Sequence, residues 1–190
     1  MGQKFPPQAL TEDESKRLLA AAKWPRDKAL LILMWRCGLR CAEACGLDLE
    51  HVRFQQDGTT QIYVNKPKGL EAGAPPRTMA MDKRSADILR SWLAVRGPES
   101  GPFLRTRTGG RLDTSHCRRL MTRLGKTARI GHRIHPHGLR HTFAAELYAE
   151  GAGMRHIQIA LGHKTLATTE AYLVSIGCNE VNDMLAKREW

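Results

Sequence analysis

The residues best suited to chemistry lie in the C-terminal third of the chain. The segment Gly138 to Tyr148 has helical periodicity, His137 stands at its entrance, and Arg140 lies one turn inside it. A helix N-terminus with free backbone N–H groups beside a guanidinium is a good site for a phosphate. His163 follows in a Leu-Gly-His sequence, and Tyr172 comes nine residues later. Two histidines, an arginine and a tyrosine in this order suit chemistry on a phosphodiester.

Each of these residues has an ordinary structural interpretation when it is taken alone. A histidine at a helix entrance is more often a cap or a solvent-facing side chain, and an arginine on a helix usually forms a surface ion pair. Tyr172 by itself would be a half-buried packing residue. The prediction of a site therefore depends on the set of residues and not on any single member.

A tyrosine can attack a phosphodiester only with help from its neighbours. Its phenol has a pKa of about 10, so a base such as His137 must take the proton. Fixed guanidiniums stabilise the charge that develops on the non-bridging oxygens. The phosphotyrosyl ester preserves the bond energy, so attack by a DNA 5′-hydroxyl can reseal a strand without ATP. Because guanidiniums take the place that Mg²⁺ has in kinases, we expect neither a metal nor another cofactor.

The charge of the chain points to a nucleic acid as the partner. The net charge is +11 and the sequence pI is about 9.9, which favours a polyanion. From Phe103 to Lys164 there are 12 Lys and Arg against 3 acidic residues, an excess of +9. Aromatic residues make up only 6% of the chain and form no stacking ladder. Double-stranded DNA is therefore favoured over single-stranded RNA.

Composition limits the class of protein. A chain of 190 residues with 42% hydrophobic content can bury a real core. It has no apolar run long enough to span a membrane and no signal-peptide pattern, and its odd number of cysteines suits a reducing compartment. We expect a cytoplasmic protein without a membrane partner. Cys37, Cys41 and Cys45 recur every four residues, which predicts one helical stripe of small buried residues; without a CxxC pair, zinc is not expected.

The first half of the chain must supply the scaffold. Residues 1–10 are expected to be a mobile leader. Hydrophobic periodicity and caps predict three helices, and a change to period 2 then predicts three strands with a turn at Asp57-Gly58. The first expected helix opens with the Thr11–Glu14 capping box and runs to about Lys23. The second is capped by Asp27 and ends near Gly38, and the third is Arg40–Cys45. The expected strands are His51–Phe54, Thr60–Asn65 and Arg77–Met81.

The second half predicts further helices. One is capped by Asp82 and runs to about Val95, a basic one runs from Thr114 to about Ala128, and the helix with His137 and Arg140 follows. Asn179 to Arg188 is a final amphipathic helix. The fold class is thus mainly α with a small antiparallel three-stranded sheet (α+β).

Three separated sequences add a resemblance to these observations. Gly38-Leu39-Arg40-Cys41-Ala42-Glu43 lies upstream, and His137-Gly138-Leu139-Arg140-His141 and Leu161-Gly162-His163 lie downstream. With them the chain resembles the tyrosine recombinase (phage integrase) family over nearly its whole length. The resemblance implies one catalytic domain from 1 to 190, without the N-terminal core-binding domain that most integrases carry. Such a chain is either a cut-out catalytic domain or a naturally short member.

The resemblance implies a role for each candidate residue. Arg40 and Arg140 match the arginines that grip the scissile phosphate. His137 matches the position that handles the proton of the nucleophile, and His163 the later histidine that touches the phosphate. Tyr172 matches the nucleophile.

Supporting roles follow from the same resemblance. Glu43, one helical turn after Arg40, matches an acidic position that braces the arginine, and His141 is a second supporting residue. The lysine that protonates the leaving 5′-oxygen would come from the sheet hairpin. Lys66 is our first choice and Lys68 the alternative.

The function implied is a site-specific DNA recombinase or integrase that works through a 3′-phosphotyrosyl intermediate. A type IB topoisomerase-like or resolvase activity, or a non-catalytic DNA-binding accessory protein of the same fold, remains open. The implied partners are double-stranded DNA and further copies of the chain, as a tetramer on DNA and a monomer free in solution. The C-terminal helix, 179–190, either packs on its own domain or is exchanged between protomers, and we favour exchange.

Overall fold

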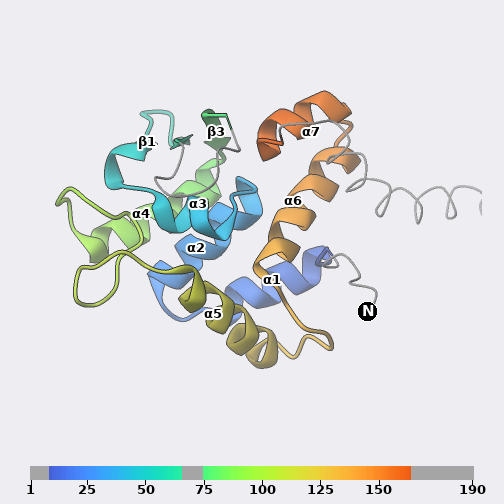
Figure 1. The fold of residues 1–190 in the computed structure, drawn as a ribbon, viewed down its shortest axis with the longest axis horizontal. Helices are drawn as coiled ribbons and strands as arrows, with labels where there is room; N and C mark the ends of the chain where they lie inside the picture. The colour runs from blue at the N-terminus through green and yellow to red at the C-terminus, as the bar shows by residue number, and fades with distance from the viewer. Residues whose placement is uncertain (1–8, 66–74, 164–190) are drawn as a thin grey trace, which may run out of the picture.

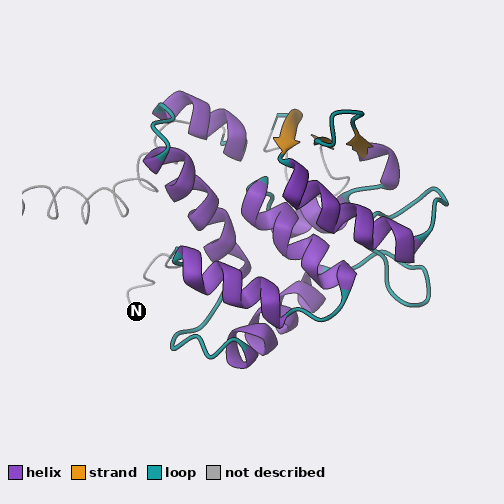
Figure 2. Ribbon diagram, turned by 180° about the vertical axis from the view of Figure 1, so that it is seen from behind, coloured by secondary structure: helices purple, strands orange, loops and turns teal. Residues whose placement is uncertain are grey.

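The computed structural model of the protein describes residues 9–65 and 75–163. This part of the chain contains seven α-helices, one 3-10 helix and a three-stranded sheet, as expected for the fold class (Figures 1 and 2). The predictions for Lys66, Lys68, Tyr172 and the C-terminal helix lie outside the described residues. The elements in chain order are α1 (Glu12–Ala21), α2 (Pro25–Arg36), α3 (Cys41–Gly46), η1 (Leu49–His51), β1 (Val52–Phe54), β2 (Thr60–Val64), β3 (Arg77–Met81), α4 (Lys83–Arg96), α5 (Thr114–Thr127), α6 (Pro136–Ala149) and α7 (Met154–Leu161).

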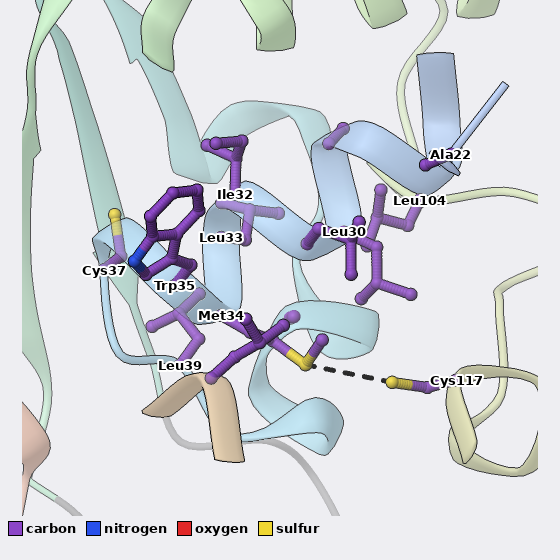
Figure 3. Packing of buried hydrophobic residues seen from close by; sticks show 14 of the residues in the cluster. Ala22, Leu30, Ile32, Leu33, Met34, Trp35, Cys37, Leu39, Leu104 and Cys117 are labelled. Atoms are coloured by element: carbon purple, nitrogen blue, oxygen red, sulfur yellow. Dashed lines mark hydrogen bonds between the residues drawn. The ribbon is translucent and has the colours of Figure 1, made fainter. Parts of the chain in front are cut away.

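Helix α2 is the centre of the core. It packs against α3, α4 and α6, with the sheet and α7 towards one end of the molecule and α5 at the other (Figure 1). All residues from Ala29 to Trp35 are buried, because neighbours cover the helix on every side. In Figure 3 the side chains of α2 are drawn together with residues from outside the helix, such as Leu39, Leu104 and Cys117, and the Cys117 thiol of α5 contacts the Met34 sulfur at 3.8 Å. No helix in the described part of the chain is long and apolar enough to cross a membrane.

The helix starts show which sequence signals decided the boundaries. The predicted capping box of α1 is present, with the Glu14 amide donating to the Thr11 hydroxyl at 3.2 Å, and Asp82 caps α4. The predicted cap of α2 was wrong. Trp24 is the N-cap, and Pro25 begins the helix because proline suits the first helical position. Asp27 is instead buried in the first turn.

The sheet is an antiparallel meander in the order β1-β2-β3. Its turn has Gly58 at φ +89°, and the Asp57 carboxylate accepts a hydrogen bond from the Thr59 amide at 2.8 Å. Strand β3 has the predicted bounds, whereas His51 belongs to η1. In the register of β2 and β3, Val64 pairs with Arg77, so these two residues are the last pair before the connection between the strands.

Two interpretations of the sequence require correction. Cys37 and Cys41 do not share one helical stripe, because α2 ends at Arg36 and the chain turns at Gly38 before α3 begins. Leu10, which we placed in a mobile leader, is 5% exposed, and its amide donates to the Thr142 hydroxyl of α6 at 2.8 Å. Leu10 is therefore part of the packed fold. Helix α7 was not anticipated, because its sequence was interpreted only for the Leu-Gly-His motif.

Candidate active site

A turn at Gly38 brings the start of α3 next to α6. Gly38 has φ +58°, and a Cβ there would lie 2.3 Å from Cδ1 of Phe143, so only glycine fits both the conformation and the space. The turn ends at Arg40, the N-cap of α3. The side chain of Arg40 is 35% exposed and can reach a ligand outside the fold.

Arg140 lies at the floor of this region on α6. Arg140 is buried, with 2% of its surface exposed. Its Nη1 donates to the carbonyl of Gly38 and its Nη2 to the carbonyl of Leu161, each at 2.5 Å. These two bonds join the turn before α3 to the end of α7. The guanidinium is thus fixed by backbone from both sides.

Glu43 on α3 connects the arginines of the site. Its carboxylate accepts from the Arg40 amide at 2.7 Å and from Arg40 Nη1 at 3.1 Å. Arg77 of β3 forms a fork on the two carboxylate oxygens at 3.0 and 2.9 Å, and Arg140 Nη1 lies 3.7 Å away. Burial acts to raise the pKa of Glu43, but the hydrogen bonds and charges of these arginines outweigh it and hold the pKa below its ordinary value. One ionised carboxylate therefore binds two guanidiniums through hydrogen bonds and lies 3.7 Å from a third.

The histidines surround the same cluster in different environments. His137, in the first turn of α6, is exposed, yet desolvation and then the charges of Arg140 and Arg40 lower its pKa. His163 is 8% exposed, and burial followed by the same two arginines lowers its pKa to about 4. The pKa of His141 also falls to about 4, through burial and then the charges of His137 and Arg140. All three imidazoles are consequently neutral at neutral pH.

The end of α7 determines where His163 lies. Gly162 adopts the left-handed conformation that closes the helix. The side-chain amide of Gln158 donates to the His163 carbonyl at 3.1 Å, and the His163 amide donates to the Gln158 carbonyl at 3.1 Å. Gln158 is 4% exposed and was missed by the sequence analysis.

Arg77 is the other residue that the sequence analysis missed. A signal for it was available, because Arg77 shares the inward positions of β3 with Met79 and Met81. An arginine at such a position needs a buried acidic partner. The structure supplies that partner in Glu43.

The structure thus brings six of the candidate residues together: Arg40, Glu43, His137, Arg140, His141 and His163. Two of the three segments outside the described residues neighbour this region in the chain, since 66–74 lies between β2 and β3 and 164–190 follows His163. Lys66, Lys68 and Tyr172 belong to those segments. Within 9–65 and 75–163, no group of three or more His, Cys, Asp or Glu side chains is arranged to hold a metal ion.

Comparison with known proteins gives a consistent set of relatives. The model of the phage integrase family matches residues 8–175. A tyrosine recombinase XerC of Pseudomonas entomophila is 34% identical over 150 residues, which cover 77% of this chain and 47% of the relative. A tyrosine recombinase XerA of Thermococcus kodakarensis is 37% identical over 171 residues, which cover 87% of this chain and 57% of the relative. The chain spans about half the length of the curated relatives it matches.

Solved structures share the fold. The crystal structure of a XerA recombinase superposes with a TM-score of 0.81 at 32% identity and covers 98% of this chain and 68% of its own. A XerH site-specific recombinase bound to its difH substrate, in a post-cleavage complex, gives a TM-score of 0.78 over 95% of this chain and 53% of its own. At 21% identity the second likeness concerns the fold alone.

Proposed function

The chain belongs to the phage integrase family, and from this premise we propose that it is a tyrosine-type DNA strand transferase. In this proposal it acts as a site-specific recombinase or integrase that cleaves and rejoins DNA through a 3′-phosphotyrosyl intermediate. The observation that carries the proposal is the buried carboxylate of Glu43, which holds Arg40 and lies within 3.7 Å of Arg140. Such an arrangement holds the positive charges of Arg40 and Arg140 close together, where both can act on one phosphate.

Arg40 and Arg140 stabilise the transition state in this mechanism. The pentacoordinate phosphorus gathers negative charge on its non-bridging oxygens, and guanidinium donors already held in place need no reorganisation to receive it. Arg140 is held by two carbonyls and Arg40 by Glu43. His163, neutral and buried beside both arginines, can donate one N–H to the same phosphate.

His137 is the base in this mechanism, and Tyr172 is the nucleophile. A base must be unprotonated before the reaction, and desolvation together with the charges of Arg140 and Arg40 lowers the pKa of His137, which favours the unprotonated form. Its exposed position at the start of α6 allows a tyrosine to reach it. We assign the protonation of the leaving 5′-oxygen to Lys66, with Lys68 as the alternative.

Helix α5 extends the positive surface away from the site. The charge of Arg118 contributes to lowering the pKa of His137, so the N-terminal half of α5 lies near α6. The exposed basic residues of α5 are Arg118, Arg119, Arg123 and Lys126. Duplex DNA that placed a phosphate at Arg40 would be supported by this face, through contacts that weaken with salt.

Assembly into a tetramer on DNA, from a monomer in solution, is the further part of the proposal. A pocket of about 260 Å³ lies beside β3, α6 and α7. Met79, Phe143 and Leu147 are among its apolar lining residues, and Arg36, Asp82, Glu146 and Glu150 are its charged ones. The C-terminal segment carries an apolar stripe of Val181, Met184 and Leu185 that suits the apolar part of this lining. We propose that this stripe from one protomer occupies the pocket of its neighbour, which would couple each active site to assembly.

A nicked suicide duplex tests the chemistry. The protein should form a covalent adduct with DNA that survives SDS, and Tyr172→Phe should abolish it. An adduct formed by Tyr172→Phe would show that Tyr172 is not the nucleophile, and no adduct with the unaltered chain would favour the DNA-binding accessory protein. Relaxation of supercoils by monomers would favour the topoisomerase alternative, whereas synapsis of two sites would support recombination.

A further inference from the structure

Arg77, the first residue of β3, is a buried arginine whose contacts join separate parts of the site. It is 7% exposed. Its two terminal nitrogens grip the Glu43 carboxylate at 3.0 and 2.9 Å, and its Nε donates to the Ala160 carbonyl at 2.9 Å. A planar guanidinium can make these three bonds at once because its donors point in fixed directions. A lysine could supply the charge but not the geometry.

On one side, Arg77 acts on the two arginines through Glu43. The carboxylate that it grips also accepts from the amide and Nη1 of Arg40, and Arg140 lies 3.7 Å from it. A buried carboxylate left without the fork would be drawn towards its remaining partners. The fork therefore sets the position of Glu43 relative to both guanidiniums.

On the other side, Arg77 acts on the end of α7. It binds the Ala160 carbonyl, and Arg140 binds the next carbonyl, that of Leu161. Gly162 and His163 follow directly. Two arginines thus hold the last turn of the helix that places His163.

Arg77 is also fixed within the sheet. It pairs with Val64, so that β2 and β3 are joined at this position. The connection that follows Val64 and Asn65 contains Lys66 and Lys68 in the sequence. The same residue is therefore bonded to α3 and to α7 and is paired with the strand that leads into the connection.

We propose that Arg77 is a positioning residue of the strand-transfer reaction. It sets the spacing between Arg40, Arg140 and His163, and it does so through its own bonds to Glu43 and Ala160 and not through a contact with the DNA. This role rests on the proposed function, since it concerns the rate at which the bound phosphate is attacked.

The test is the rate of adduct formation at saturating protein on the suicide duplex, compared with DNA affinity and thermal unfolding. Arg77→Lys should lower that rate by about 100-fold while affinity stays within about threefold, because the charge remains and the fork is lost. Arg96→Lys is the matched control. Arg96 is likewise buried, at 2% exposed, and it bonds to the carbonyls of Gly97, Glu99, Gly101 and Pro102, none of which belongs to the cluster around Glu43. Arg96→Lys should lower thermal stability and leave the rate at saturation unchanged.

The pH dependence supplies a readout that a loss of stability alone would not move. In Arg77→Gln, Glu43 loses the partner that most lowers its pKa, so the acidic limb of the pH–rate profile should move to higher pH. An unmoved limb, or a wild-type rate for Arg77→Lys, would overturn the role of Arg77 while leaving the proposed function intact. Failure of the unaltered protein to form any adduct would overturn both.

Discussion

Gly38 lies directly against the ring of Phe143, so that a methyl group on its Cα would be 2.3 Å from the ring atom Cδ1. This contact joins the turn before Arg40 to the helix that carries Arg140. The distance between the two arginines therefore depends on a residue with no side chain.

Gly38→Ala should accordingly destabilise the fold and slow cleavage. It combines a left-handed backbone with a steric clash, and we expect a loss of about 3 kcal/mol or more in the free energy of unfolding. Gly101→Ala is the control, because Gly101 has φ +100° but nothing within 4 Å of a Cβ, and it should cost about 1–2 kcal/mol. Urea titrations measure both. Equal losses would show that the contact with Phe143 relaxes freely.

Arg40→Ala should separate catalysis from binding. Many basic residues share the contacts to phosphates, so affinity should stay within about tenfold and the salt slope should fall by about one unit. Cleavage at saturating protein should fall by about 100-fold or more. Arg140→Ala should show the same division, together with a loss of stability because Arg140 also binds two carbonyls.

The control for this division is Arg84→Ala, which removes one charge from an exposed position on α4. This change should alter neither the DNA affinity nor the cleavage rate at saturating protein by more than about twofold. If Arg40→Ala lost binding and cleavage in parallel, Arg40 would be a binding residue and not one that acts in the transition state.

Stability should fall between pH 6.5 and pH 4. The pKa values of His141 and His163 are about 4 in the fold against an ordinary 6.5, so the unfolded chain takes up protons first as the pH falls. The contribution of these two histidines to the free energy of unfolding is fully present above pH 6.5. It declines as the pH falls to about 4, and below that pH it is lost and changes no further. Urea unfolding at pH 7.5 and 5.0 measures the slope. His141→Gln should reduce this slope, because it removes one of the two histidines with a lowered pKa.

Lys66 should be the general acid for the 5′-oxygen. A substrate with a bridging 5′-sulfur expels a thiolate that needs no proton, so it should rescue Lys66→Ala. The ratio of rates on sulfur and oxygen substrates is the measurement. Rescue of Lys68→Ala instead would transfer the role by two residues, and rescue of neither would mean that both lysines only contact phosphates.

Truncation after Cys178 should abolish synapsis and recombination while single-site DNA binding survives. A matched change at the receiving surface, Leu147→Glu, should give the same phenotype, because the apolar stripe would meet a charge. Gel shifts on one and two sites report both steps. A truncated protein that recombines normally, or that no longer folds, would make the segment an ordinary helix of its own domain.

Local signals in the sequence predicted most element boundaries. Thr11, Asp82 and Asp57-Gly58 act on their immediate neighbours, so their effects could be anticipated. The partner of Arg77 could not be found in this way. Glu43 lies 34 residues away, and a single sequence does not say which buried acid meets which buried base. The Cys37–Cys41 spacing misled for a different reason, since the four-residue period was extended across the break near Gly38 that the helix boundaries had themselves predicted.

The hydroxyl of Thr142 accepts the Leu10 amide at 2.8 Å and lies 3.0 Å from the Gly138 carbonyl, two residues before Arg140. This clamp has a mechanical consequence. Tension on the chain ahead of Leu10 is borne by the first turns of α6, the helix that holds Arg140 and His137, before it reaches α1. A pull at that end of the described fold is therefore a load on the helix that carries Arg140 and His137.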